Sequence, residues 1–165
     1  MHQMSWSESA GGMTFTYRQF CELTGLSKKE ADTWVRNGLI KTGRHPNGRW
    51  RVYRMESVFE GVIAKRLADF SSRELLADMM NALRDYLDTC RITPADLHQR
   101  PFELLMITTR KTKKLKAGGG VRGVESHVTP FQPGDRRDSN PVFAVVDLGA
   151  TDRQIWEAIP KMSHY

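Results

Sequence analysis

Two helix-start signals, separated by a single glycine turn, constrain this chain more than any other feature of its sequence. Thr16 stands three residues before Gln19, and Ser27 stands three residues before Glu30. Each pair has the form of a capping box, in which the two side chains satisfy each other's backbone N–H groups. Gly25 lies between the two segments, where a positive φ would end the first helix. The sequence therefore predicts two short helices joined by a tight turn, which is the helix-turn-helix arrangement.

A basic β-hairpin is predicted directly after the second helix. Asn47 and Gly48 form the dipeptide most typical of a two-residue turn, because both central positions of that turn need a positive φ. The following strand, residues 49–53, alternates with period two. We expect Trp50 and Val52 to face the core, and the outer face to carry Arg49, Arg51 and Tyr53. Outward cations repel one another, so this wing either binds a polyanion or is a solvated hairpin whose arginines only prevent edge-to-edge association.

Residues 14–65 resemble the winged helix-turn-helix of MerR-type regulators and of the related excisionase-like DNA-binding proteins. The resemblance rests on Leu23-Thr24-Gly25-Leu26-Ser27, on Trp34-Val35-Arg36-Asn37-Gly38-Leu39-Ile40 and on Arg49-Trp50-Arg51-Val52-Tyr53. It implies a recognition helix in the major groove and a wing that contacts the flanking backbone or the minor groove. The chain departs from the family at Asp32, where these regulators usually carry an arginine, and nothing in it matches their cysteine metal-sensing sites.

The residues expected to contact DNA lie on the second helix and on the wing. Ala31, Trp34 and Val35 are expected to face the core of the domain. The opposite face of the helix would then offer base and phosphate contacts in the major groove. The wing side chains would position the duplex through its backbone. The candidate DNA-binding residues are Lys28, Lys29, Asp32, Thr33, Arg36, Arg44, Arg49, Arg51 and Tyr53.

The distribution of charge agrees with a nucleic-acid partner for the N-terminal part. The chain of 165 residues carries a formal net charge of +6. Residues 1–54 contain nine Lys and Arg against four Asp and Glu, whereas residues 55–90 contain four against seven. Positive charge is thus concentrated on the predicted DNA-binding unit, as expected for an electrostatic footprint. No apolar run reaches the length of a membrane span, so we expect a cytoplasmic, nucleoid-associated protein with no membrane partner.

Two longer helices are expected after the wing. Residues 55–70 repeat apolar side chains at helical spacing and should close a DNA-binding domain over residues 14–70. Residues 71–100 should contain a helix whose apolar positions step by four and three, as in a heptad seam. This stripe is either core packed on the preceding helix or a dimer interface, and the pattern allows both. The dimerisation candidates are Leu76, Met80, Leu83 and Leu87.

Residues 101–165 are expected to form a strand-loop-strand-helix appendage. The apolar runs 102–109 and 142–148 should pair as antiparallel strands, because the backbone groups of each strand need a partner. We expect this pair to dock on a second subunit, with the helical domain or a partner protein as alternatives.

Two segments are expected to lack regular structure. Residues 1–13 are polar and are expected to be disordered. Residues 110–140 are rich in Gly, Pro, Lys and Arg, and are expected to form a flexible basic loop. That loop is either merely solvated or an arm with auxiliary DNA contacts through Lys111, Lys113, Lys114 and Lys116.

Patterns for catalysis and metal binding are weak. Gly118-Gly119-Gly120 lacks the Lys-Ser/Thr of a phosphate-binding loop, and the five histidines include no pair at ligand spacing. No local motif joins a nucleophile to a base. We therefore expect no enzyme activity, no metal and no cofactor.

These observations lead to one expected fold and one expected function. The fold is mainly α with small β elements: a winged helix-turn-helix, further helices and a small α+β appendage. The function is sequence-specific binding of double-stranded DNA by a homodimeric, MerR-like bacterial or mobile-element transcriptional regulator, which would work with RNA polymerase. The alternatives are an architectural DNA-binding factor, such as an excisionase or a phage packaging subunit, and a protein-interaction adaptor that uses the C-terminal third.

Overall fold

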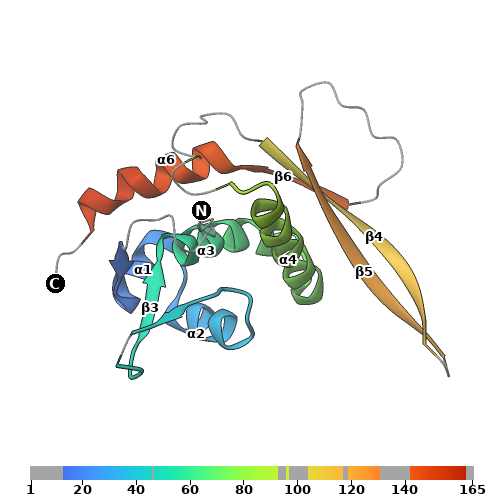
Figure 1. The fold of residues 1–165 in the computed structure, drawn as a ribbon, viewed down its shortest axis with the longest axis horizontal. Helices are drawn as coiled ribbons and strands as arrows, with labels where there is room; N and C mark the ends of the chain where they lie inside the picture. Colours follow the sequence, from blue (N-terminus) through green and yellow to red (C-terminus); the bar gives the residue numbers. More distant parts are fainter. Residues whose placement is uncertain are drawn as a thin grey trace, which may run out of the picture.

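The computed structural model contains α-helices and two three-stranded β-sheets (Figure 1). The structure describes residues 13–45, 47–92, 96, 104–116, 119–130 and 142–162, so the segment expected to be disordered lies outside it except for Met13. In chain order the elements are β1 (Thr14–Phe15), α1 (Tyr17–Thr24), α2 (Lys28–Arg36), β2 (Gly43–Arg44), β3 (Arg51–Arg54), α3 (Met55–Ala68), α4 (Arg73–Thr89), β4 (Leu104–Lys116), β5 (Gly119–Pro130), β6 (Val142–Asp147), α6 (Leu148–Ala158) and the 3-10 helix η1 (Ile159–Lys161). No helix in the described ranges is both long and apolar enough to cross a membrane.

Both predicted capping boxes are present at the starts of α1 and α2. The Thr16 hydroxyl accepts from the Gln19 N–H at 3.3 Å, and the Gln19 side-chain oxygen accepts from the Thr16 N–H at 3.0 Å. At α2, the Glu30 N–H donates to Ser27 Oγ at 3.2 Å and the Ser27 N–H donates to Glu30 Oε2 at 2.8 Å. Gly25 ends α1 with a φ of +69°, which a residue with a Cβ rarely adopts. The chain between residues 16 and 36 is therefore fixed by interactions within each helix turn.

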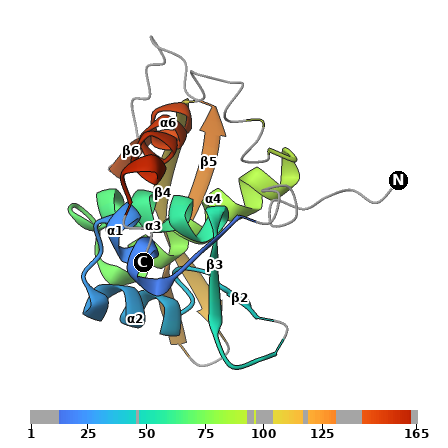
Figure 2. The ribbon, with the colours of Figure 1, turned by 90° about the vertical axis from the view of Figure 1, so that its left-hand side faces the viewer.

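Helix α3 is the centre of the core. It contacts α1, α4 and α6, and it lies among them in both ribbon views (Figures 1 and 2). Its side chains are buried around the whole helix rather than along one stripe, with Val58, Phe59 and Ile63 at most 2% exposed. A Cβ added at Gly61 would lie 2.5 Å from Thr24 Cγ2, so glycine is what allows α1 to approach α3 this closely. The N-terminal helices are thus held on a rigid support.

The apolar stripe of α4 is part of the same core. Leu76, Met80, Leu83 and Leu87 are each no more than 4% exposed within the single chain. Of the two alternatives for this seam, core packing is therefore the one found, and the use of these four residues as a dimer interface is wrong. The stripe faces α3 and the second sheet, both of which come from the same chain.

The second sheet has the order β5-β4-β6 and contains one predicted pairing and one unpredicted strand. β4 and β6 are antiparallel, with Leu105 opposite Val146 and Thr109 opposite Val142, as expected for the two apolar runs. The expected flexible basic loop is wrong for residues 110–116 and 119–130, which extend β4 and form β5. Lysine-rich composition is common in exposed edge strands, so charge alone does not distinguish such a strand from a loop. Residues 117–118 and 131–140 of that expected loop lie outside the described residues.

The C-terminal appendage docks on the helices of its own chain. Leu105 and Ile107 of β4 are fully buried, and β5 contacts α4. Arg66 of α3 donates to Thr151 Oγ1 at 2.9 Å and to the side-chain oxygen of Gln154, which joins α3 to α6. The appendage therefore packs on the helical domain, which was one of the alternatives, and docking on a second subunit stays a prediction.

Candidate nucleic-acid interface

Helix α2 presents its charged residues outward. Ala31 is fully buried, and Trp34 and Val35 are half-buried against the core, as the sequence predicts. This orientation follows from the period of the helix, since residues three and four apart share a face. The exposed side chains that remain on α2 include Lys28, Lys29, Asp32 and Arg36.

The start of α2 is anchored to both neighbouring helices. Lys65 of α3 forms an ion pair with Glu30 at 2.7 Å. This ammonium group, followed by the hydrogen bonds from Ser27, lowers the pKa of Glu30 from 4.5 to about 2. The Tyr17 hydroxyl of α1 donates to the Lys28 carbonyl at 2.8 Å. The exposed face of α2 therefore has a fixed orientation relative to the body of the protein.

Asp32 and Thr33 differ in how they are placed on α2. Asp32 is exposed and lies beside Tyr17, whose pKa is raised mainly by burial and then by the Asp32 carboxylate. Thr33 is half-buried and lines a hollow between α2 and α4, together with Leu39 and Leu76. Thr33 is therefore less exposed than Lys29, with which it was expected to share the outer face of α2, whereas Asp32 is exposed as expected.

A β-hairpin follows α2 where the sequence predicts it. β2 and β3 are antiparallel, with Arg44 opposite Arg51. The pairing continues to the His45 N–H, which donates to the Trp50 carbonyl at 3.0 Å. The turn differs from the predicted one, because Gly48 has a φ of +71° whereas Asn47 does not have a positive φ. The connection thus spans residues 45–50 instead of two residues with positive φ. We call residues 43–54 the wing.

Two aromatic side chains of the wing are placed opposite to expectation. Tyr53 is only 3% exposed and stacks on Phe20 of α1, with 4.4 Å between the ring centroids. Trp50 is 70% exposed. The predicted alternation is wrong for these two residues, because the aromatic rings of α1 cover Tyr53, whereas Arg49 and Arg51 are exposed as expected. Tyr53 is therefore a core residue, and the expectation that it faces DNA is wrong.

A hollow of about 490 Å³ lies where the wing meets the start of α1 and the middle of α2. It is lined by Thr16, Tyr17, Asp32, Arg49, Trp50, Arg51 and Tyr53. Arg44, Arg49 and Arg51 are exposed, as are the α2 residues Lys28, Lys29 and Arg36. Among the predicted residues, Asp32 is brought together with Arg49 and Arg51. The sequence reasoning missed Tyr17 and Trp50, and the signal available for Trp50 was its position between two arginines.

The basic residues of the C-terminal part form a second, separate group. Lys111, Lys113, Lys114 and Lys116 all belong to β4, and Lys113 lies opposite Arg122 of β5 in the sheet register. The distal parts of β4 and β5, residues 110–116 and 119–125, pair only with each other and extend beyond the helices (Figure 1). We call these residues the arm. Figures 1 and 2 both place the end of the arm on the same side of the molecule as the wing and α2, and Figure 1 separates arm and wing on either side of α2.

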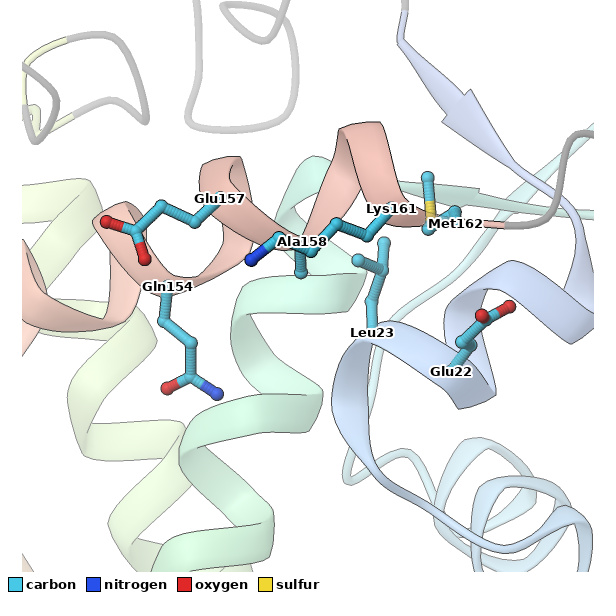
Figure 3. A pocket seen from close by; sticks show the side chains of 7 residues that line it. All are labelled: Glu22, Leu23, Gln154, Glu157, Ala158, Lys161 and Met162. Carbon is cyan, nitrogen blue, oxygen red and sulfur yellow. The ribbon is translucent and has the colours of Figure 1, made fainter.

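A further hollow, of about 300 Å³, lies between α1 and the C-terminal helices. Its carboxylates, Glu22 and Glu157, lie at opposite ends of the hollow and point away from each other (Figure 3). They do not form a carboxylate pair of the kind used in general acid and base catalysis. Within the ranges that the structure describes, no three His, Cys, Asp or Glu residues are grouped as metal ligands.

A scan of the sequence against protein-family models and a search of curated proteins both found no match.

Proposed function

We propose that this protein binds double-stranded DNA sequence-specifically, as a transcriptional regulator of MerR-like type with a winged helix-turn-helix over residues 14–70. The observation that carries the proposal is the exposed group of cations on α2 and the wing: Lys28, Lys29, Arg36, Arg44, Arg49 and Arg51. Folding alone gives no reason to collect like charges on one surface, because they repel one another. A phosphate backbone would neutralise them and release counterions.

In the proposed complex, α2 enters the major groove with its N-terminal turn leading. Lys29 and Arg36 lie about two helical turns apart on α2, so together they would contact a long stretch of the groove. Arg36 is suited to guanine, whose O6 and N7 accept two hydrogen bonds from one guanidinium. Asp32 is suited to cytosine N4, which donates a hydrogen bond.

The wing would bind the backbone beside the major groove. Arg44 and Arg51 are directly opposite each other in the β2–β3 pair, and Arg49 follows in the turn. These side chains carry no information on sequence when they contact phosphates, but they fix the register of α2 on the duplex.

The arm would supply auxiliary phosphate contacts through Lys111, Lys113, Lys114 and Lys116. The end of the arm lies on the same side of the molecule as α2 and the wing (Figures 1 and 2). A single duplex bound along α2 would therefore extend toward the arm. A two-stranded ribbon also fits a groove of B-DNA. The arm and the wing would then hold the duplex on both sides of the recognition helix.

An architectural factor is the second candidate, and it is favoured by a specific observation. A basic arm and an exposed Trp50 are devices by which proteins hold bent DNA. A homodimer, which we propose for the regulator, would need a surface other than the buried stripe of α4. The genes beside this one would separate the two candidates, since a divergent promoter favours the regulator and an integrase or terminase favours the architectural factor.

Selection of bound fragments from a genomic library, followed by two matched substitutions, tests the proposal. Arg36→Ala should cost about 1–3 kcal/mol and relax the preference at one or two base pairs, because it removes a base contact. Arg51→Ala should weaken binding to all duplexes equally, because it removes a phosphate contact. Recovery of no enriched sequence would contradict sequence-specific binding. Equal loss of specificity from both changes would contradict the assigned roles.

A further inference from the structure

Trp50 is the most exposed of the large hydrophobic side chains in the described residues. It is 70% exposed, compared with 58% for Phe70 and 38% for Trp156. An indole ring gains from burial in a partner because most of its surface is apolar. Within the chain, it is Tyr53, and not Trp50, that stacks on Phe20 of α1. Trp50 is therefore left for a surface outside the protein.

The backbone holds Trp50 in a defined position in the wing. Its carbonyl accepts from the His45 N–H at 3.0 Å, and the next residue, Arg51, is paired with Arg44 in the sheet. On the other side, the Gly48 N–H donates to the His45 carbonyl at 2.7 Å and closes the turn. A fixed backbone limits the conformational freedom that the turn loses when it binds a partner, which favours binding through Trp50.

The charges around Trp50 identify its partner. Both of its sequence neighbours, Arg49 and Arg51, are exposed arginines, and Arg44 lies opposite Arg51. Guanidinium groups bound to the phosphates on either side of a groove would place the indole between them at the edges of the bases. A flat aromatic ring at that place stacks on bases once a base step opens.

We propose that Trp50 is a wedge that enters the minor groove beside α2, unstacks one base step and bends the duplex. This inference rests on the proposed function and adds to it a role for an apolar side chain. Minor-groove proteins use apolar wedges in this way and kink the duplex toward the major groove. Pyrimidine–purine steps unstack most readily, so such a step is expected under the wing. The bend would turn the flanking DNA around the protein, which is the action of an architectural factor.

The test uses the full chain and a duplex recovered by selection from a genomic library. Donor and acceptor dyes on the duplex ends report bending, and 2-aminopurine at the step under the wing reports unstacking. The unsubstituted protein should bring the ends closer and raise the 2-aminopurine fluorescence. At saturating protein, Trp50→Ala should lose both signals and bind about tenfold more weakly, because one stacking interaction is removed. Trp50→Phe should restore part of each signal, since phenylalanine also serves as a wedge.

Two controls separate the wedge from other effects. Phe70→Ala removes another exposed aromatic ring, from the end of α3, and should change neither signal. Arg51→Ala should weaken binding but leave the bend at saturation. The wedge is overturned if Trp50→Ala leaves the bend undiminished. It is also overturned if Trp50→Ala weakens binding without any loss of the 2-aminopurine signal, because that result would place the indole on the sugar-phosphate backbone. Failure of the unsubstituted protein to bind any duplex would instead overturn the proposed function itself.

Discussion

A buried ion pair joins the two central helices to the chain that leaves α2. Arg84 of α4 donates from Nε to Glu60 Oε1 of α3 at 2.5 Å, and its side chain is only 10% exposed. The same guanidinium also donates to the Leu39 carbonyl. Glu60 Oε2 accepts from the Lys41 N–H at 2.8 Å. Three segments of the chain, α3, α4 and residues 39–41, therefore meet at one pair of charges, just before the wing begins.

Arg84→Met should destabilise the protein strongly. Methionine has a similar length and fills the space, but it leaves the Glu60 carboxylate, which is 9% exposed, without a counter-charge. Removing one partner of a buried pair costs about 3–5 kcal/mol. The unpaired Leu39 carbonyl is part of the same loss and is not added to it. Because the free energy of unfolding of a domain is roughly 5–15 kcal/mol, this single change removes a large part of it.

Urea unfolding followed by circular dichroism measures this loss. The matched control is the double variant Glu60→Gln with Arg84→Met, which removes both charges and keeps an oxygen to accept from the Lys41 N–H. The double variant should be at least about 1–2 kcal/mol more stable than Arg84→Met alone, because no buried charge remains. The reasoning is refuted if Arg84→Met unfolds within about 1 kcal/mol of the unsubstituted protein, or if the double variant is the less stable of the two.

Three substitutions outside this network have equally defined outcomes. Glu30→Gln should lower the free energy of unfolding by under about 1 kcal/mol at neutral pH, since its ion pair with Lys65 is half-exposed. The pKa of Glu30 is lowered, so this stability is present above pH 4.5 and is lost as the pH falls toward about 2; a constant difference in urea midpoint across that range would contradict it. Met80→Asp should unfold the chain by burying an unpaired carboxylate, and a folded monomer in sedimentation would instead restore the dimer seam. Asp32→Asn should raise affinity for mixed-sequence DNA by about fivefold at low salt, because it removes a repulsion of ~1 kcal/mol between the carboxylate and a phosphate. Unchanged affinity in a fluorescence titration would place α2 away from the phosphates.

The sequence predicts well those parts of the fold that depend on neighbouring residues. The capping boxes of Thr16 and Ser27 are correct because all their partners lie within one helical turn. The pairing of β4 with β6 is also correct, because two apolar runs in one small appendage each need a strand beside them. The candidate cations of α2 are exposed for an equally local reason, since Ala31 fixes which face of the helix is buried.

The errors arise where distant residues decide the outcome. In β3, period two places Arg51 and Tyr53 on one face, yet Arg51 is exposed and Tyr53 is buried because it stacks on Phe20 of α1. No pattern within the strand contains that information. In β5, glycine and charge indicate a loop, but pairing with β4 satisfies the backbone of both segments. In α4, a heptad stripe is the same whether it packs on α3 or on another copy of the chain, so the pattern allows both alternatives.

The salt dependence of DNA binding tests the proposed interface most directly. Fluorescence anisotropy with a mixed-sequence duplex gives the slope of log affinity against log salt for the full chain and for Arg49→Ala with Arg51→Ala. We predict a steep negative slope for the unsubstituted protein, which becomes shallower by about 1.8 in the double variant, or roughly 0.9 for each phosphate that is no longer neutralised. Lys161 of η1 lies near the C-terminal end of α1, away from the wing. Lys161→Ala is therefore the matched control and should leave the slope unchanged. Absence of DNA binding would contradict a DNA-binding surface on α2 and the wing. So would a Lys161→Ala variant whose slope is as shallow as the slope expected on removal of one wing arginine.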